Sequence, residues 1–502
     1  AKTTGLLTVA SINDTVAALS ADTLYITGAV PVTVNDAASI AQLTAIDAKT
    51  TGLLTVTSVS DTAAALAADT TYINGAIPVS VSGAASIAQL TAIDGKTTGA
   101  LTVASITDSV VNLVNDSTYV TGAVPVTVSS VANLTQLAAI DAKTTGVLTV
   151  TSIEDSVSAL LNDTLYINGS VPVSVLGTAD LTQLATIDAK TTGTLTATAI
   201  ADTATALISD TTYVNGSIPV TITTAASLSQ LASIDAKTAG TLTATSIADT
   251  AVALAADTTY IKNAIPVSVT DTATIAQLGS IDGKTTGALT VASITDSATN
   301  LIADSIYVTG AVPVTVSGAA TIAQLTSIDG KTTGTLTVES INDTSANLIA
   351  DSTYVTGAVP VTVNNPTSLA DLATIDGKTT GTLTVTSVTD TASALAADAT
   401  YITGAIPVTV SDAATIAQLT AIDAKTTGLL TVASINDTVA ALSADTLYIT
   451  GAVPVTVNDA ASIAQLTAID AKTTGLLTVT SVSDTAAALA ADTTYITGAI
   501  PV

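Results

Sequence analysis

Apolar positions along the chain follow two different periodicities in turn. Over residues 30–34 every second residue is valine, which is the period of a strand with one buried face. Ile40, Leu43 and Ile46 then recur at intervals of three, which is the period of a short helix. The pattern therefore predicts a strand, a turn and a helix within about 24 residues.

The stretch before this one repeats the same order of elements. An alternation begins at Leu7, Asp14 and Thr15 can cap a helix, and Val16 and Leu19 then point to one side of it. Both halves begin at a glycine and contain a strand pattern followed by a helix pattern. We therefore predict two related coils of about 23 to 24 residues each.

These two coils form one unit of 47 residues that recurs without insertions. The units are 1–47, 48–94, 95–141, 142–188, 189–235, 236–282, 283–329, 330–376, 377–423, 424–470 and the partial unit 471–502. Residues 1–79 return as 424–502 with one difference, Asn74 against Thr497. Because there is no initiator Met or signal peptide, we expect this continuous array to be an excerpt of a longer chain.

A 47-residue unit without disulfides cannot bury enough apolar surface alone, so stacking of the units is expected. The predicted fold is an α/β solenoid, in which a parallel sheet runs along the stack and short helices pack over it. Pro31 and its equivalents lack an N–H and fit best at the first position of a strand or at a bulge. The high content of Thr, Val and Ile leaves an all-β solenoid as the alternative.

Composition excludes most catalytic chemistry. The chain has 40 acidic and 12 basic residues, a net charge of −28, and no His, Cys, Met, Trp or Phe. Nucleophilic triads and ordinary zinc sites therefore cannot form, and the negative surface disfavours nucleic acid. A glycosidase with paired Asp is the only enzymatic alternative. An active site is normally a single cleft with walls that differ from one another, which identical repeats do not form. We therefore predict that the chain is not an enzyme. No apolar run is long enough for a membrane span.

Three aspartate columns, each a set of equivalent residues 47 positions apart, are the main candidate sites. They begin with Asp14, Asp61 and Asp108; with Asp22, Asp69 and Asp116; and with Asp47, Asp94 and Asp141. One interpretation is that they cap helices and close turns. The other is that stacked carboxylates hold calcium, although no known calcium motif is present. Apart from calcium, we expect no cofactor.

The remaining repeated residues favour structural roles. Lys2 and its equivalents are expected to neutralise an acidic column, and Tyr25 to pack at the rim with a solvated hydroxyl. Gly28 and Gly52, from the ITG and TTG runs, are expected to adopt positive φ at turns. Rows of Thr could order water and bind ice, although Thr is also a good exposed strand residue.

Two phrases carry a resemblance to a known class of protein. The runs IAQLTAIDAKTTG at 40–52 and SDTAAAL at 60–66 resemble repeats of giant bacterial cell-surface proteins, which are Thr/Ala/Asp-rich arrays found especially in marine cyanobacteria and proteobacteria. The resemblance covers the whole chain and implies an exported adhesin or cell-envelope fibre. It supplies no residue roles.

Pattern, charge and resemblance together predict a structural extracellular filament or a surface-layer-like stalk, located at the cell surface. The alternative is a calcium-dependent adhesin stalk that mediates cell-surface or biofilm attachment. The expected partner is the chain itself, through end-to-end continuation or filament assembly, and a cell-surface or matrix ligand could bind through terminal domains outside this segment.

Overall fold

The computed structural model describes residues 7–502, which contain regularly alternating strands and short helices. The chain divides into two compact units, Ala1–Ser246 and Ile247–Val502. The boundary falls inside strand β12 (Leu242–Asp249). The 47-residue sequence period continues on both sides of it.

The first unit contains a strand and a helix in each complete coil. Its strands are β1 (Ile12–Asp14), β2 (Val32–Ala38), β3 (Leu54–Asp61), β4 (Val79–Ala85), β5 (Leu101–Asp108), β6 (Val126–Val128), β7 (Leu148–Val150), β8 (Ile153–Ser156), β9 (Val173–Ala179), β10 (Leu195–Asp202) and β11 (Val220–Ala226). Its helices are α1 (Val16–Ala21), α2 (Ile40–Asp47), α3 (Ala63–Ala68), α4 (Ile87–Asp94), α5 (Val110–Asn115), α6 (Leu134–Asp141), α7 (Val157–Asn162), α8 (Leu181–Asp188), α9 (Ala204–Ser209) and α10 (Leu228–Asp235).

The second unit continues the same order of elements. After β12, its strands are β13 (Val267–Ala273), β14 (Leu289–Ser297), β15 (Val314–Ala320), β16 (Leu336–Asp343), β17 (Val361–Val363), β18 (Leu383–Val385), β19 (Val388–Asp390), β20 (Val408–Ala414), β21 (Leu430–Asp437), β22 (Val455–Ala461) and β23 (Leu477–Val482). Its helices are α11 (Ala251–Ala256), α12 (Ile275–Asp282), α13 (Ala298–Ala303), α14 (Ile322–Asp329), α15 (Ser345–Ala350), α16 (Leu369–Asp376), α17 (Ala392–Ala397), α18 (Ile416–Asp423), α19 (Val439–Ala444), α20 (Ile463–Asp470) and α21 (Ala486–Ala491).

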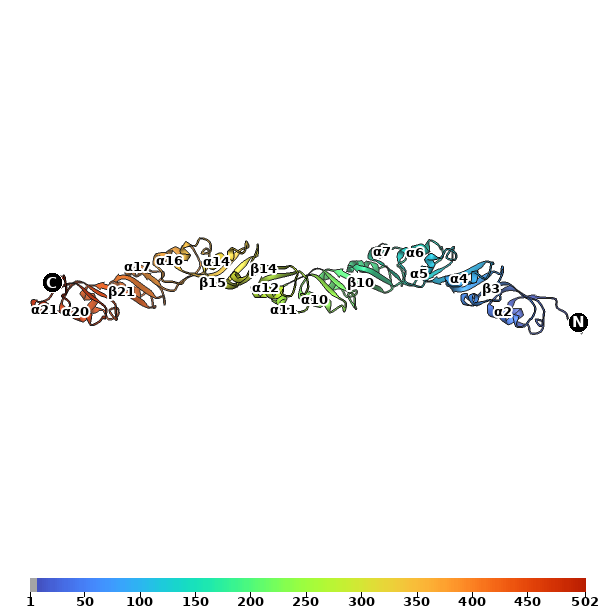
Figure 1. The fold of residues 1–502 in the computed structure, drawn as a ribbon, viewed down its shortest axis with the longest axis horizontal. Coiled ribbons are helices and arrows are strands. Elements are labelled where there is room, and N and C mark those ends of the chain that lie inside the picture. Colours follow the sequence, from blue (N-terminus) through green and yellow to red (C-terminus); the bar gives the residue numbers. More distant parts are fainter. Residues whose placement is uncertain (1–6) are drawn as a thin grey trace. The chain divides into compact units, whose positions relative to one another are not determined.

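Within each sheet, neighbouring strands pair in parallel, so sequence order is also the order in the sheet. In the first unit, β1 to β7 form one such sheet, and in the second, β19 to β23 form another. Within each unit the elements follow one another in chain order (Figure 1). The prediction of a parallel sheet with short helices is confirmed as an α/β repeat of solenoid-like architecture, and the all-β alternative is wrong because helices follow the strands throughout the described chain.

Strand pairing alternates between a long and a short register. Five residues of β2 pair with β3, from Val32 opposite Leu54 to Ala38 opposite Val59, with an irregularity after Val34. Only three residues of β3 pair with β4. The same difference separates β4–β5 from β5–β6, and β20–β21 from β21–β22. Most 47-residue repeats thus contain one extensive and one limited coil interface, whereas β6–β7 and β17–β18 have three pairs each, like the limited ones.

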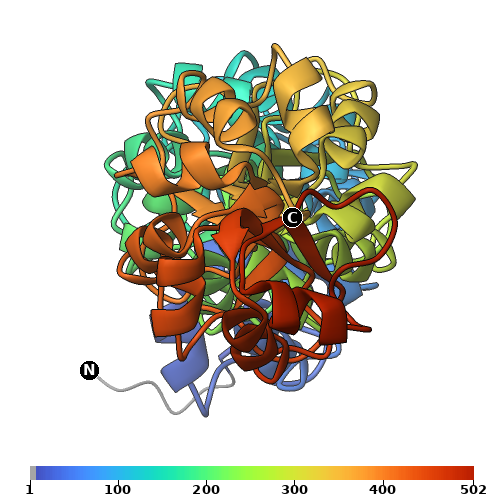
Figure 2. The same ribbon diagram turned by 90° about the vertical axis from the view of Figure 1, so that its left-hand side faces the viewer.

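The core lies between the sheet and the helices that cover it. Val32 and Val34 from β2, with Leu43 and Ile46 from α2, are fully buried, as the two periodicities predict. Figure 2 looks onto the last coils of the second unit, whose helices lie outside and whose strands lie toward the middle. A fully buried aliphatic side chain contributes about 1.5–3 kcal/mol, so four in one coil are its main stabilising contribution.

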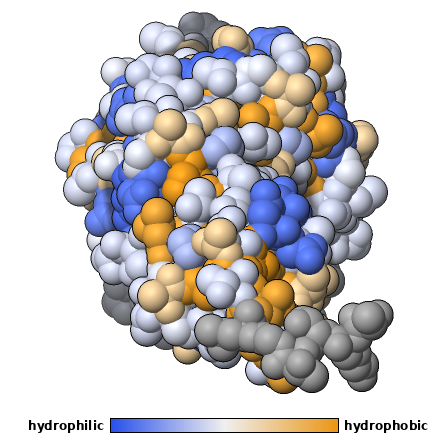
Figure 3. Space-filling model, turned by 90° about the vertical axis from the view of Figure 1, so that its right-hand side faces the viewer, coloured by the Kyte–Doolittle hydropathy of each residue, from blue (hydrophilic) through white to orange (hydrophobic). Residues whose placement is uncertain are grey.

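Each coil completes the core of its neighbour. In the first described coil Leu7 is 62% exposed, whereas its equivalent one unit later, Leu54, is only half-exposed because a preceding coil packs beside it. Figure 3 faces this first coil and shows apolar side chains among polar ones on its surface. Pro31 lies one residue ahead of the predicted position, directly before β2, and its carbonyl accepts a hydrogen bond from Ile12 N at 2.9 Å.

Within residues 7–502, the short helices include none with the length and apolar character that crossing a bilayer requires.

Candidate functional site

The Asp14 column joins the starts of helices in adjacent coils. Asp61 ends β3, and its Oδ1 accepts a hydrogen bond from Thr62 N at 2.7 Å. Its Oδ2 accepts a hydrogen bond from Ile40 N, the first N–H of α2 in the preceding coil, at 2.9 Å. The same two contacts are made by Asp108, Asp155, Asp202, Asp296, Asp343, Asp390, Asp437 and Asp484. The predicted capping role is confirmed, and the contact with the second helix adds a link between coils.

These contacts stabilise the charged carboxylate. Burial acts to raise the pKa of Asp108, but hydrogen bonds from the Asn112 side chain and from the N–H groups of Ser109 and Ile87 outweigh it, so the pKa lies below its usual value. The anion also lies at helix N-termini, where the helix dipole favours negative charge.

The Asp22 column closes the loop after each first helix. Asp22 is the C-cap of α1, and its Oδ2 accepts hydrogen bonds from Tyr25 N at 2.9 Å and Ile26 N at 2.8 Å. The backbone hydrogen bond from Ile26 is the largest cause of the lowered pKa of Asp22, against an opposing effect of burial. The predicted turn role of this column is confirmed.

The repeated lysine binds the C-terminal end of the helix in the preceding coil. Lys49 Nζ donates to the carbonyl oxygens of Leu19, Ser20 and Asp22 at 3.1, 2.6 and 2.7 Å. These carbonyls end α1 and have no partner within the helix, so the ammonium satisfies them and complements the helix dipole. The predicted neutralisation of an acidic surface is thus replaced by a specific cap between coils.

A buried threonine and a glycine lock the loops of successive coils together. The Thr50 side chain is 7% exposed, and its Oγ1 donates to Val30 O at 2.7 Å and accepts from Gly52 N at 2.9 Å. A Cβ on Gly52 would lie 2.4 Å from the carbonyl carbon of Val30. The predicted positive φ is confirmed for Gly28, at +64°. At Gly52 the prediction is wrong, because glycine is needed there for a different reason, the close approach of the Val30 backbone.

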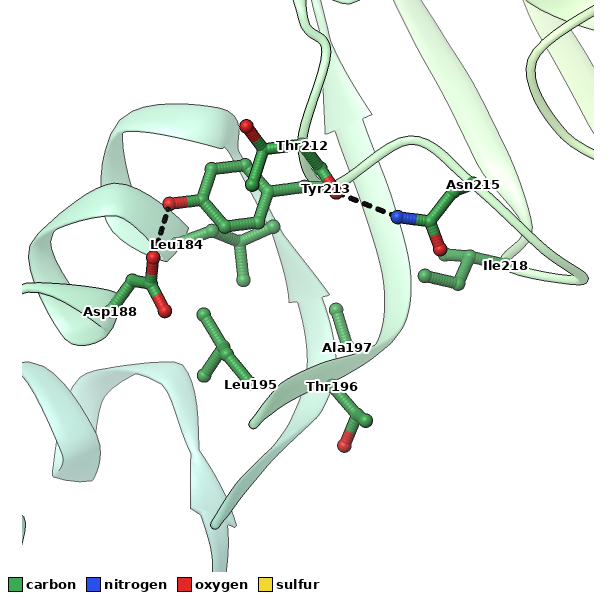
Figure 4. Close-up of a pocket in the computed structure, with 9 residues that line it drawn as sticks. All are labelled: Leu184, Asp188, Leu195, Thr196, Ala197, Thr212, Tyr213, Asn215 and Ile218. Atoms are coloured by element: carbon green, nitrogen blue, oxygen red, sulfur yellow. Dashed lines mark hydrogen bonds between the residues drawn. The ribbon is translucent and has the colours of Figure 1, made fainter. Parts of the chain in front are cut away.

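The Tyr25 and Asp47 columns meet in hydrogen-bonded pairs. The Tyr213 hydroxyl donates to Asp188 Oδ2 at 3.1 Å, from the loop after α9 to the last residue of α8 (Figure 4). The expected solvated tyrosine hydroxyl is therefore wrong. Equivalent pairs are Tyr72 with Asp47, Tyr119 with Asp94, Tyr166 with Asp141, Tyr307 with Asp282, Tyr354 with Asp329, Tyr401 with Asp376, Tyr448 with Asp423 and Tyr495 with Asp470.

We expect the chain to lose stability in alkaline solution. Burial, followed by the hydrogen bond to Asp188 and the charges of Asp188 and Asp210, raises the pKa of Tyr213 above its ordinary value of 10.0. A raised folded-state pKa gives a contribution that is complete below the unfolded value and is lost as pH rises through the folded value. Thermal midpoints should therefore fall above about pH 10, and the fall should be smaller in a variant with all tyrosines changed to Phe. An identical pH profile for both chains would contradict this.

A shallow pocket lies beside each of two tyrosines of this column. Around Tyr213 it has a volume of about 230 Å³, and Leu184, Leu195 and Ile218 form its apolar walls (Figure 4). The equivalent pocket around Tyr448 has a volume of about 420 Å³. At Tyr213 the half-buried ring spans one side, and the Asp188 carboxylate lies at its hydroxyl end.

The candidate calcium residues are distributed over separate contacts. Asp61 binds helix N-termini, Asp69 closes a loop and Asp47 accepts from a tyrosine. In the part of the chain that the structure describes, no three carboxylates gather where they could hold a metal ion.

Calcium binding stays a prediction, and thermal unfolding tests it. Binding to the folded chain alone would raise the unfolding midpoint with calcium concentration, and a chelator would reverse the rise. An unchanged midpoint in both solutions would remove calcium from the Asp14, Asp22 and Asp47 columns. Magnesium at the same concentration serves as the control for general screening of charge.

Two structural contributors escaped the sequence interpretation. One is Thr50, which the pattern of apolar and polar positions does not distinguish from its neighbour Thr51. The sequence does contain a difference between them: the threonine equivalent to Thr50 recurs in every repeat, whereas Ala239 replaces the threonine equivalent to Thr51. The other is the capping box of α2, formed by Ser39 and Gln42.

No protein family matches this sequence, and comparisons with curated proteins and with solved structures find no match.

Proposed function

We propose that this chain is part of a structural filament, an extracellular fibre or surface-layer-like stalk in which a continuous solenoid provides length. One observation carries the proposal: the repeated polar residues join one coil to the next. Asp61 links two helix starts, Lys49 caps a helix of the preceding coil, and Tyr72 reaches the preceding Asp47. Such a chain uses its polar chemistry for cohesion along the stack.

Charge and composition support the same proposal. The net charge of −28 keeps neighbouring chains apart through electrostatic repulsion, while contacts along each chain are polar and short-range. The absence of Cys and Met removes the residues most easily oxidised, which suits a protein exposed outside the cell. The proposal assigns no catalysis to the repeats. Calcium-dependent attachment stays a separate prediction, decided by the calcium experiment above.

Surface labelling tests the proposed location and assembly. An antibody raised against the 47-residue unit should label intact cells of the source organism, and immunogold electron microscopy should place the label along fibres. Deleting the gene should remove both label and fibres, whereas restoring it should return them. Labelling that requires permeabilised cells, or fibres that persist without the gene, would overturn the proposal. An antibody against a cytoplasmic protein controls for cell integrity.

A further inference from the structure

We propose that the pocket between Tyr213, Asp188 and Leu195, with its equivalent at Tyr448, binds the ammonium group of an aliphatic amine. The inference is independent of the structural role. The pocket has a mixed lining that places apolar side chains beside a single carboxylate, which is the combination that an alkyl chain with a terminal positive charge requires.

The walls of the pocket match the alkyl part of such a ligand. Leu195 and Ala197 come from the first half of β10, where they are only half-buried, and Leu184 comes from the buried face of α8. Ile218 lies on the loop before β11 and completes the apolar lining. In Figure 4 the Thr196 side chain, which is exposed, points away from these apolar side chains. An alkyl chain placed against the half-buried Leu195, Ala197 and Ile218 removes apolar surface from water.

The hydrogen-bonding groups of the pocket favour a ligand that donates. The Tyr213 hydroxyl already donates to Asp188, and the Asn215 amide donates to Thr212 O at 2.6 Å. Asp188 has a second carboxylate oxygen, Oδ1, and an ionised carboxylate accepts several hydrogen bonds. An ammonium group brings three donors of its own to this carboxylate, whereas an anion would be repelled by it.

Charge and the aromatic ring favour a cation in the same place. The pocket lining contains one carboxylate and no lysine, and the chain around it is strongly negative. Lys190, the lysine that follows Asp188, is held by three carbonyl oxygens of the preceding coil. The ring of Tyr213 lines the site, and cations bind favourably over the face of an aromatic ring.

Tyrosine fluorescence gives a direct test because the 11 tyrosines are the only aromatic residues of the chain. The probe is n-butylammonium, titrated into the full chain at constant ionic strength. We expect a saturable change in tyrosine emission. Ammonium, which has the charge without the alkyl chain, and 1-butanol, which has the alkyl chain without the charge, should each bind at least tenfold more weakly. Sodium ions at the same concentration control for screening.

Each outcome decides the proposal. A response to ammonium equal to that of butylammonium would mean general counterion binding, and an equal response to butanol would mean an uncharged apolar cavity; either overturns it, as does no response at all. Changing the Asp47 column to Asn, Asp188→Asn included, should weaken butylammonium binding at least tenfold while leaving butanol binding unchanged. The comparison of the three probes uses the unaltered chain, so it remains decisive if that variant fails to fold.

Discussion

Replacing Gly193 with alanine is expected to destabilise the surrounding coils by about 3 kcal/mol, which is at the upper end for overpacking. A Cβ there would lie 2.4 Å from the carbonyl oxygen of Val171, and that oxygen also accepts the Thr191 hydroxyl at 2.6 Å. Neither group is a flexible side chain that can rotate away, so the loops must separate. Hydrogen exchange measured by mass spectrometry should show faster exchange of amides in the two coils that meet at Gly193, and the thermal midpoint should fall.

The matched control is Gly169→Asn in the same loop pair. Gly169 has φ +55°, and a Cβ there would meet no atom within 4 Å. The chain itself carries Asn263 at the equivalent position, with φ 58°. We expect a loss below about 1 kcal/mol, because Asn tolerates this conformation. If both variants were equally destabilised, close backbone approach would not explain the TTG glycine.

Replacing Asp202 with alanine is expected to cost about 3 kcal/mol. Its carboxylate accepts Thr203 N at 2.7 Å and Leu181 N at 3.0 Å, so one substitution removes the acceptors of two helix starts. A hydrogen bond to a charged group contributes about 1.5–3 kcal/mol to stability. Because Asp202 is only half-buried, we expect each of its two hydrogen bonds to contribute near the lower end of that range. Exchange should accelerate in α8 and α9 together. Acceleration confined to α9 would mean that Asp202 caps only its own helix.

The control for this variant is Thr224→Gly. Thr224 Oγ1 accepts Ala204 N at 3.2 Å, a neutral contact between the same kinds of elements one coil further along. Glycine already occupies the equivalent positions Gly83, Gly177 and Gly318. We expect a loss of about 1 kcal/mol, mostly from the conformational freedom of glycine.

The regular elements could be predicted from the sequence because each coil repeats the same local signals. Burial of Leu43 and Ile46 follows from helical spacing, and capping by Thr15 follows from its place before the apolar residues. The partners of Asp61 and Lys49 could not be predicted, since they lie about 20 to 30 residues away and depend on the register between coils. The sequence period fixes which residues recur, whereas strand register decides which of them touch.

The same limit explains the two corrections at the glycine and tyrosine positions. Gly52 and Gly28 look alike in sequence, but only the packing of Gly52 against Val30 separates steric need from positive φ. Tyr72 and Asp47 are 25 residues apart, and the stacking of one coil on the next brings the hydroxyl to the carboxylate. Both features therefore arise from contacts that no local pattern contains.

The alternation of long and short strand pairing sets how such a chain would yield to mechanical load. Within each 47-residue repeat, a pull along the direction of stacking acts on the hydrogen bonds that join successive strands. The three-residue interface, such as β3–β4, gives way before the five-residue interface of β2–β3. Extension would therefore proceed in steps of one 47-residue pair of coils, each releasing about 160 Å of chain. A fibre of these repeats would lengthen stepwise and absorb work before it broke.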